Sequence, residues 1–161
     1  MQRLFFSIFI LFCLPLYSFA NVSVCFTPPS KCGDFIVGQI KQAKQSIYVQ
    51  AYGFTSKKII NALIEAKNRG IEIEIILDRS NFYKKKQNII RLLESNQITI
   101  YQDKVAGIAH NKVMIIDSKK VITGSFNFTE NADKNNAENV IILDDINVAN
   151  KYYQNWKTRK K

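Results

Sequence analysis

The alternation of strand-like and helix-like segments between residues 22 and 101 constrains the fold of this chain most strongly. Short runs rich in β-branched and aromatic residues predict strands, and apolar residues spaced along one helical face predict helices between them. The strands are predicted at 22–26, 47–52, 71–77 and 98–101, and the helices at 30–45, 56–70 and 83–95. This alternation indicates an α/β architecture in which helices cover a sheet.

The second half of the chain adds strands that are not separated by helices. Two strands are predicted at 112–117 and 121–124, around a tight turn at Ser118–Lys119. A third strand, at 139–143, leads into a final helix. Together the two halves predict a single mixed β-sheet flanked by helices. No internal repeat or linker divides the chain, and we expect one domain over residues 21–161.

Residues 1–20 have the features of a cleavable export signal. Arg3 supplies a positive charge, residues 4–14 are mostly apolar, and Ser18-Phe19-Ala20 fits a small-x-small cleavage site. The apolar run is shorter than the ~20 residues that a bilayer span needs. We therefore expect an exported protein, periplasmic or secreted, that begins near Asn21. An uncleaved membrane anchor is the alternative.

Two cysteines remain once Cys13 leaves with the signal. Cys25 and Cys32 lie close together in the sequence, in a compartment that permits disulfides. A bridge would tie the first strand to the loop that follows it, and we expect this bridge. Two free thiols are the alternative.

The only histidine of the chain belongs to a spaced pattern of polar residues. In one-letter code the pattern is H-x-K-x4-D-x6-G-S-x-N, formed by His110, Lys112, Asp117, Gly124, Ser125 and Asn127. Six specified positions, each matched by chance about 5% of the time, give roughly 1 in 10^7 to 10^8 per starting point. The pattern is therefore specific enough to predict a shared chemical role.

His110 and Lys112 are two residues apart, so on an extended backbone their side chains project to the same side. An imidazole beside an ammonium suits a phosphodiester, because the lysine neutralises the non-bridging oxygens while the imidazole attacks phosphorus. The lysine also disfavours imidazolium, which keeps the histidine nucleophilic. Outside the full pattern, a solvated histidine beside a surface lysine would be the better interpretation.

Ser125 and Asn127 repeat this spacing, which places a hydroxyl and an amide on one face where both can donate to phosphate oxygens. Phe126 and Phe128 then point to the other side, where core packing is favoured over base stacking. Asp117 has two open interpretations: a catalytic carboxylate, or an aspartate that stabilises the turn after its strand.

Metal-dependent hydrolysis is not expected. A zinc site needs several His or Cys ligands, whereas this chain has one histidine, and Cys25 and Cys32 are far from it in sequence. His110-Asn111-Lys112 superficially resembles the start of a metal-dependent H-N-H nuclease motif, but no later histidine completes that site. We therefore expect neither a metal nor another cofactor.

The chain is strongly basic, with 23 Lys and Arg against 13 Asp and Glu and a net charge of +10. Such an excess favours polyanionic partners, either nucleic acid or an anionic membrane surface. Basic residues cluster at 57–58, 84–86, 119–120 and 157–161. Some of them would follow the phosphates of a nucleic acid along a groove.

The pattern from His110 to Asn127 resembles the signature of the phospholipase D superfamily, whose members cleave phosphodiesters through a phosphohistidine. Segments 51–55, 66–70 and 124–129 are likewise similar to the short exported phospholipase D-type endonucleases of bacteria. The resemblance implies a phospholipase D-like fold with one motif per chain. It also implies metal-independent, rather non-specific hydrolysis of DNA or RNA.

A homodimer follows from the same resemblance, because one imidazole attacks phosphorus and another protonates the leaving oxygen. A two-fold dimer would bring two copies of His110 to one site. In this family a glutamate placed like Glu138, in a segment like 136–139, orients the histidine by accepting a hydrogen bond from Nδ1–H. An exposed charge at a strand start is the alternative for Glu138.

Two other functions stay open. Phospholipase D-type hydrolysis of an anionic membrane phospholipid uses the same motif, because both substrates are phosphodiesters. The short chain and high charge favour nucleic acid. A non-catalytic nucleic-acid-binding module is the third possibility, although binding alone requires no histidine.

Overall fold

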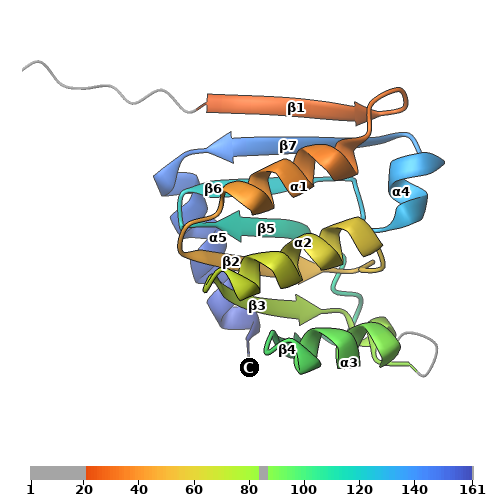
Figure 1. Ribbon diagram of the computed structural model, residues 1–161, viewed down its shortest axis with the longest axis vertical. Helices are drawn as coiled ribbons and strands as arrows, with labels where there is room; N and C mark the ends of the chain where they lie inside the picture. The colour runs from red at the N-terminus through yellow and green to blue at the C-terminus, as the bar shows by residue number, and fades with distance from the viewer. Residues whose placement is uncertain (1–20, 84–86, 161) are drawn as a thin grey trace, which may run out of the picture.

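A mixed β-sheet forms the centre of the molecule, with helices packed on its two faces (Figure 1). The computed structural model describes residues 21–83 and 87–160. Residues 1–20, which carry the expected export signal, lie outside the described part of the chain. So do residues 84–86 and 161, which belong to two of the basic clusters.

The strands and helices lie close to their predicted positions. The strands are β1 (Asn21–Thr27), β2 (Ser46–Ala51), β3 (Glu72–Leu77), β4 (Thr99–Gln102), β5 (Lys112–Ile116), β6 (Lys120–Gly124) and β7 (Glu138–Asp144). The helices are α1 (Cys32–Gln42), α2 (Lys57–Asn68), the short 3-10 helix η1 (Arg79–Asn81), α3 (Gln87–Ser95), α4 (Glu130–Lys134) and α5 (Ile146–Arg159). The predicted α/β class is confirmed.

The strand order is β1-β7-β6-β5-β2-β3-β4. β2, β3 and β4 are parallel, whereas β5, β6, β7 and β1 pair antiparallel to their neighbours. The predicted single mixed sheet is therefore confirmed. Because β5 is antiparallel to β2, β5 begins at the sheet edge where β2 and β3 end. That edge collects loops from distant parts of the chain.

Apolar side chains cover both faces of the sheet. α1 and α2 pack on one face, where Ile36, Ile40 and Leu63 are fully buried. α5 covers the other face with Trp156, whose Nε1 donates to the Val49 carbonyl at 3.0 Å. Figure 1 shows α1 and α2 in front of the sheet and α5 behind it. Among residues 21–83 and 87–160, no helix is long and apolar enough to cross a membrane.

α1 is shorter than the sequence predicts because two remote carboxylates bond to its flanks. It begins at Cys32, and Asp133 Oδ1 accepts a hydrogen bond from the Gly33 N–H at 2.7 Å. At the other end, the Asp117 carboxylate accepts the N–H groups of residues 44–46, which lead into β2 instead of continuing the helix. Each contact spans more than 70 residues of sequence.

Cys25 of β1 and Cys32 of α1 form a disulfide, as predicted. The bridge holds an edge strand to the helical layer, because β1 pairs with the distant β7 and with no strand near it in sequence. Two short elements, α4 and η1, were not predicted. Each is capped locally, by Thr129 and Asp78, but neither is long enough to show a helical period.

Candidate active site

Except for Asp117, the residues of the polar pattern lie at the sheet edge where β2 ends and β5 begins, on the right of Figure 1. The Tyr52 N–H donates to the Asn111 carbonyl at 2.9 Å, which continues the β2–β5 pairing and fixes the backbone beside His110. Ser125 follows β6 and Glu138 begins β7, so both lie at this edge.

The His110 side chain is exposed to solvent, and its ring packs against Tyr52. The two ring centroids are 4.7 Å apart and the ring planes are tilted by 59°. Lys112 Nζ donates to the His110 carbonyl at 2.8 Å and lies 5.4 Å from the centre of the Tyr52 ring. The structure therefore brings His110 and Lys112 together around Tyr52, as their spacing predicts.

Lys112 is a buried cation with little negative charge to balance it. Only 8% of the surface of Lys112 is exposed to solvent. Burial lowers the pKa of the ammonium, and the nearby Glu138 carboxylate raises it by less. In the described residues the ammonium donates to the His110 carbonyl and to no carboxylate. An anionic oxygen from a ligand would supply the missing charge.

Ser125 and Glu138 form one hydrogen-bonded unit. Ser125 Oγ donates to Glu138 Oε2 at 2.6 Å, and Asn136 Nδ2 donates to Glu138 Oε1 at 2.9 Å. The Asn139 N–H donates back to Ser125 Oγ at 3.0 Å. Within the described part of the chain, no hydrogen bond joins Glu138 to His110. The orienting role of Glu138 therefore stays a prediction, and its observed partners are Ser125 and Asn136.

Asn127 presents an unused polar atom to the site. Its Oδ1 is buried and has no hydrogen-bond partner in the described residues. A Cβ at Gly53 would lie 3.2 Å from this oxygen, so the lack of a side chain at residue 53 leaves room for the Asn127 amide. Phe126 and Phe128 are each 2% exposed, which confirms that they pack in the core. An unpartnered acceptor oxygen needs a donor, which an N–H or O–H group of a ligand would supply, whereas the amide Nδ2 is the group that could donate to a phosphate oxygen.

Asp117 lies apart from this cluster. It follows β5, whereas His110 precedes β5, so the two residues lie at opposite ends of the same strand. Its Oδ1 accepts the Gln45 and Ser46 N–H groups at 2.7 Å and 3.0 Å, and its Oδ2 accepts the Lys44 N–H at 2.9 Å. Of the two interpretations, these contacts favour the structural one.

Tyr52 is the contact residue that the sequence analysis did not single out. It lies in segment 51–55, but an aromatic residue at the end of a strand is more often part of the core. The available signal was its place just past β2, where parallel strands end and ligands commonly bind.

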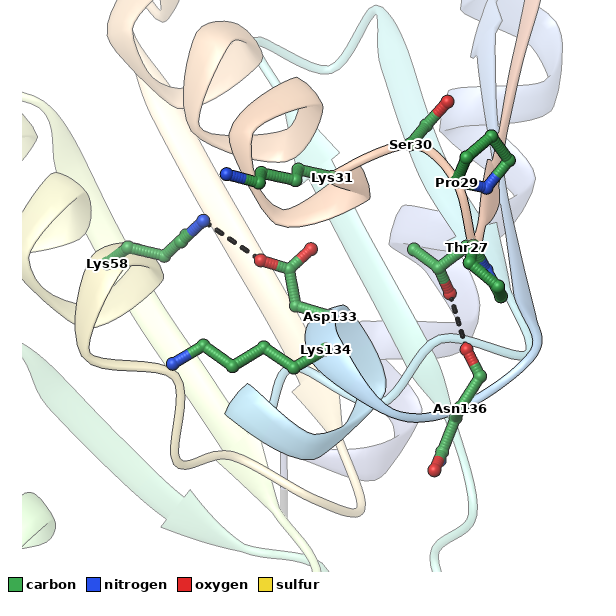
Figure 2. A pocket seen from close by; sticks show the side chains of 9 residues that line it. Thr27, Pro29, Ser30, Lys31, Lys58, Asp133, Lys134 and Asn136 are labelled. Atoms are coloured by element: carbon green, nitrogen blue, oxygen red, sulfur yellow. Dashed lines mark hydrogen bonds and ion pairs between the residues drawn. The ribbon is translucent and has the colours of Figure 1, made fainter.

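A hollow of about 300 Å³ lies beside the same edge, between α1, α2 and α4 (Figure 2). Asp133 occupies it, accepting from the Gly33 N–H at 2.7 Å and from Lys58 Nζ at 2.9 Å. Lys58 also pairs with Asp34 at 2.7 Å. These contacts join α1, α2 and α4 to one another. They also hold α4, which lies between Asn127 and Glu138 in the sequence.

No group of three or more His, Cys, Asp or Glu residues in the described ranges is arranged to hold a metal ion. The site itself presents an imidazole, an ammonium, a hydroxyl and an amide, from His110, Lys112, Ser125 and Asn127. This set of groups suits attack on a phosphodiester.

Solved structures share the fold, among them two bacterial proteins. Nuc from Salmonella typhimurium, a phospholipase D family member, superposes with a TM-score of 0.83 at 32% identity, covering 87% of this chain and 93% of that chain. NucT from Helicobacter pylori has a TM-score of 0.79 at 27% identity, covering 87% and 95%. The predicted phospholipase D-like fold is confirmed, and the fold and site together define a phosphodiester hydrolase.

Sequence comparison gives the family. Residues 36–159 match the family described as "Cardiolipin synthase, PLD-like domain". A protein named phospholipase D from Rickettsia conorii is 56% identical over 141 residues, which cover 88% of this chain and 70% of that relative. The chain belongs to the phospholipase D-like family, in its branch with one motif per chain.

Proposed function

We propose that the protein is a metal-independent endonuclease that cleaves DNA or RNA through a covalent phosphohistidine at His110. The observation that carries the proposal is an exposed imidazole beside the buried ammonium of Lys112, which no carboxylate of the described residues pairs with. A bound phosphodiester would place its negative oxygens at Lys112 and its phosphorus in front of His110.

The reaction takes two steps. Nε2 of His110 attacks phosphorus, the bond to the leaving oxygen breaks, and a second imidazole gives that oxygen a proton. The second imidazole then takes a proton from water, whose oxygen attacks phosphorus and breaks the P–N bond. Lys112, Ser125 and Asn127 stabilise the charge on the non-bridging oxygens in both steps.

The second imidazole comes from a second copy of the chain, since His110 is the only histidine. An apolar stripe on β1 supports a contact between copies. Its members alternate along one side of the strand and are half-exposed: Val22, Val24 and Phe26. Phe26 lies opposite Asn139, which donates to Ser125, so the stripe reaches the site. A two-fold contact would bury such a stripe against itself.

Mixed dimers test the shared site. Wild-type and His110→Ala chains are unfolded together, refolded at varied ratios and checked for exchange with tagged chains. If each site needs both imidazoles, activity per total protein follows the square of the wild-type fraction. A linear decline would show that each copy works alone, and Glu138 would then be the first alternative proton carrier.

Two substrate classes share this chemistry. The net charge of +10 and the resemblance to short bacterial endonucleases support nucleic acid. Relatives from Rickettsia that carry the name phospholipase D, at 54% to 56% identity, support an anionic phospholipid as the second candidate. The motif does not separate them, because both substrates are phosphodiesters.

Three parallel incubations separate these classes. Plasmid DNA, structured RNA and vesicles of anionic phospholipid are each incubated with the protein, with and without excess EDTA, and His110→Ala is the control. We expect chelator-resistant nicking of nucleic acid that the variant lacks. Release of a head group in the vesicle sample alone would establish the lipid function. Activity that disappears with EDTA and returns with a divalent ion would contradict the mechanism.

We also propose that the protein is exported and acts in the periplasm or outside the cell. The Cys25–Cys32 disulfide supports this location, because such bonds persist in oxidising compartments. Cell fractionation with mass spectrometry of the N-terminus checks it. A full-length chain with free thiols in the cytoplasmic fraction would be the contrary result.

A further inference from the structure

Asp78 joins two loops at the site edge. It follows β3 and is 4% exposed. Its Oδ1 accepts the Ser80 N–H at 2.9 Å, and its Oδ2 accepts the Ala109 N–H at 2.9 Å. Ala109 immediately precedes His110 and is 31 residues away from Asp78 in sequence. The carboxylate therefore ties the end of β3 to the backbone that carries His110.

Asn81 extends this network to the other side of the imidazole. Its side chain is buried, and Nδ2 donates to the Tyr52 carbonyl at 2.7 Å and to the Asp78 carbonyl at 3.0 Å. The Tyr52 ring packs against His110. Asp78 and Asn81 thus hold both the residue before His110 and the residue whose ring supports it.

Capping of η1 alone does not explain why residue 78 is an aspartate. One oxygen satisfies the Ser80 N–H, and serine or asparagine would do the same. The second oxygen bonds to Ala109, and only an ionised carboxylate accepts at both oxygens. Burial raises the pKa of Asp78, but the hydrogen bonds from Ser80 and Ala109, together with the charge of Arg79, lower it by more, so the carboxyl stays ionised and both oxygens can accept.

The loop before His110 needs such an anchor. Residues 106–108 are exposed, and Ile108 has 64% of its surface in solvent. After residue 109, backbone pairing to the β2 side resumes at Asn111, whose carbonyl accepts the Tyr52 N–H at 2.9 Å. The Asp78–Ala109 hydrogen bond is therefore a buried attachment for a segment that has little packing of its own.

We propose that Asp78 is a positioning residue for His110: by holding the Ala109 N–H, it keeps the imidazole against Tyr52 and aimed at phosphorus. The kinetic consequence rests on the proposed function, in which His110 is the nucleophile. The structural consequence does not, because the placement of the ring is measurable without a substrate.

The single histidine allows a direct test, since its imidazole C2 proton gives one resonance in the proton NMR spectrum of the purified protein. The ring current of Tyr52 shifts this resonance. Tyr52→Leu therefore gives the chemical shift that the His110 proton has when no aromatic ring lies beside it. At one fixed alkaline pH, Asp78→Asn is expected to move the resonance from the wild-type position toward that of Tyr52→Leu. Asp117→Asn is the control: it changes a carboxylate that is bonded to backbone N–H groups at the far end of β5. This variant should leave the His110 resonance at its wild-type position.

A second variant guards against misfolding. Asp78→Ser keeps an acceptor for the Ser80 N–H but is too short to reach Ala109, so it should fold as judged by circular dichroism. It is expected to show the same displacement of the His110 resonance. A wild-type position in either folded Asp78 variant would overturn the proposal.

Kinetics supply the second measurement. With a chromogenic phosphodiester, kcat of Asp78→Asn should fall roughly 10- to 100-fold with KM little changed, since a displacement of about 1 Å can cost 10²-fold. A raised KM with unchanged kcat would contradict positioning. If wild-type protein cleaves no phosphodiester, the proposed function fails, while the NMR shift still decides the role of Asp78.

Discussion

The two ends of β5 both carry polar residues of the same sequence pattern, yet they are built differently. At one end, the Asp117 carboxylate is fully engaged by backbone N–H groups of residues 44–46. At the other end, Lys112 is buried without a bonded carboxylate, and Asn127 Oδ1 has no partner in the described residues. Satisfied polar groups stabilise a fold, whereas buried groups with unused bonding capacity are prepared for a ligand.

The largest expected effect lies at the unsatisfied end. His110→Ala should remove detectable phosphodiester cleavage, because nucleophile and proton carrier are lost together in a shared site. Stability should change by only about 0.5 kcal/mol, since the imidazole is exposed. Cleavage assays and thermal unfolding of the same preparation measure both. Asn111→Ala, at the exposed neighbouring side chain, is the control, and near-normal activity of His110→Ala would contradict the assignment.

The next largest effect concerns Lys112. Lys112→Ala should lower kcat by about 10²-fold or more, because it removes the main charge that stabilises the transition state. Lys44→Ala removes the same charge from an exposed position near Asp117, so it controls for net charge and should stay within twofold of wild type in the same assay. Equal losses in the two variants would mean that overall charge matters and the site does not.

At the Asp117 end the comparison predicts loss of stability with activity retained. Asp117→Ala removes the acceptor for three N–H groups and places alanine at a φ of +54°. We expect a loss of roughly 2–4 kcal/mol in the free energy of unfolding, measured by urea titration. Asp117→Gly lacks the strain and should lose about 1 kcal/mol less. Reduced kcat in folded Asp117→Gly would place Asp117 back in the catalytic machinery.

The same contrast explains what the sequence could and could not predict. Strands such as 71–77 and the spacing of His110 and Lys112 are local features, so composition and period reveal them. Asp117, Asp78 and Asp133 each have hydrogen-bond partners 31 to 100 residues away, and a hydrogen bond of that kind leaves no periodic trace. α4 was missed for a related reason, because five residues are too few to show a helical stripe.

The smallest effect tests whether position at the site edge is enough to make a polar group functional. Asp103 follows β4 at the same edge of the sheet, but it is satisfied: Arg159 donates to both of its oxygens, and the Val105 N–H donates to Oδ1 at 3.0 Å. Asp103→Asn should therefore cost about 1 kcal/mol at neutral pH and leave kcat within twofold of wild type.

The pH dependence of that stability difference gives the sharper check. Burial raises the pKa of Asp103, but the hydrogen bond from Arg159, with further hydrogen bonds and the charge of Arg159, lowers it by more, so the folded-state pKa lies below the ordinary value of about 3.9. A lowered folded-state pKa stabilises the protein above the ordinary value, and this contribution is lost as pH falls through the folded-state pKa. The difference between wild type and Asp103→Asn, measured by thermal unfolding, should shrink as pH falls below about 4. A stability difference that is constant with pH would show that the ion pair with Arg159 contributes nothing. A large fall in kcat would show that polar groups at this edge act together, even where their hydrogen bonds are all satisfied.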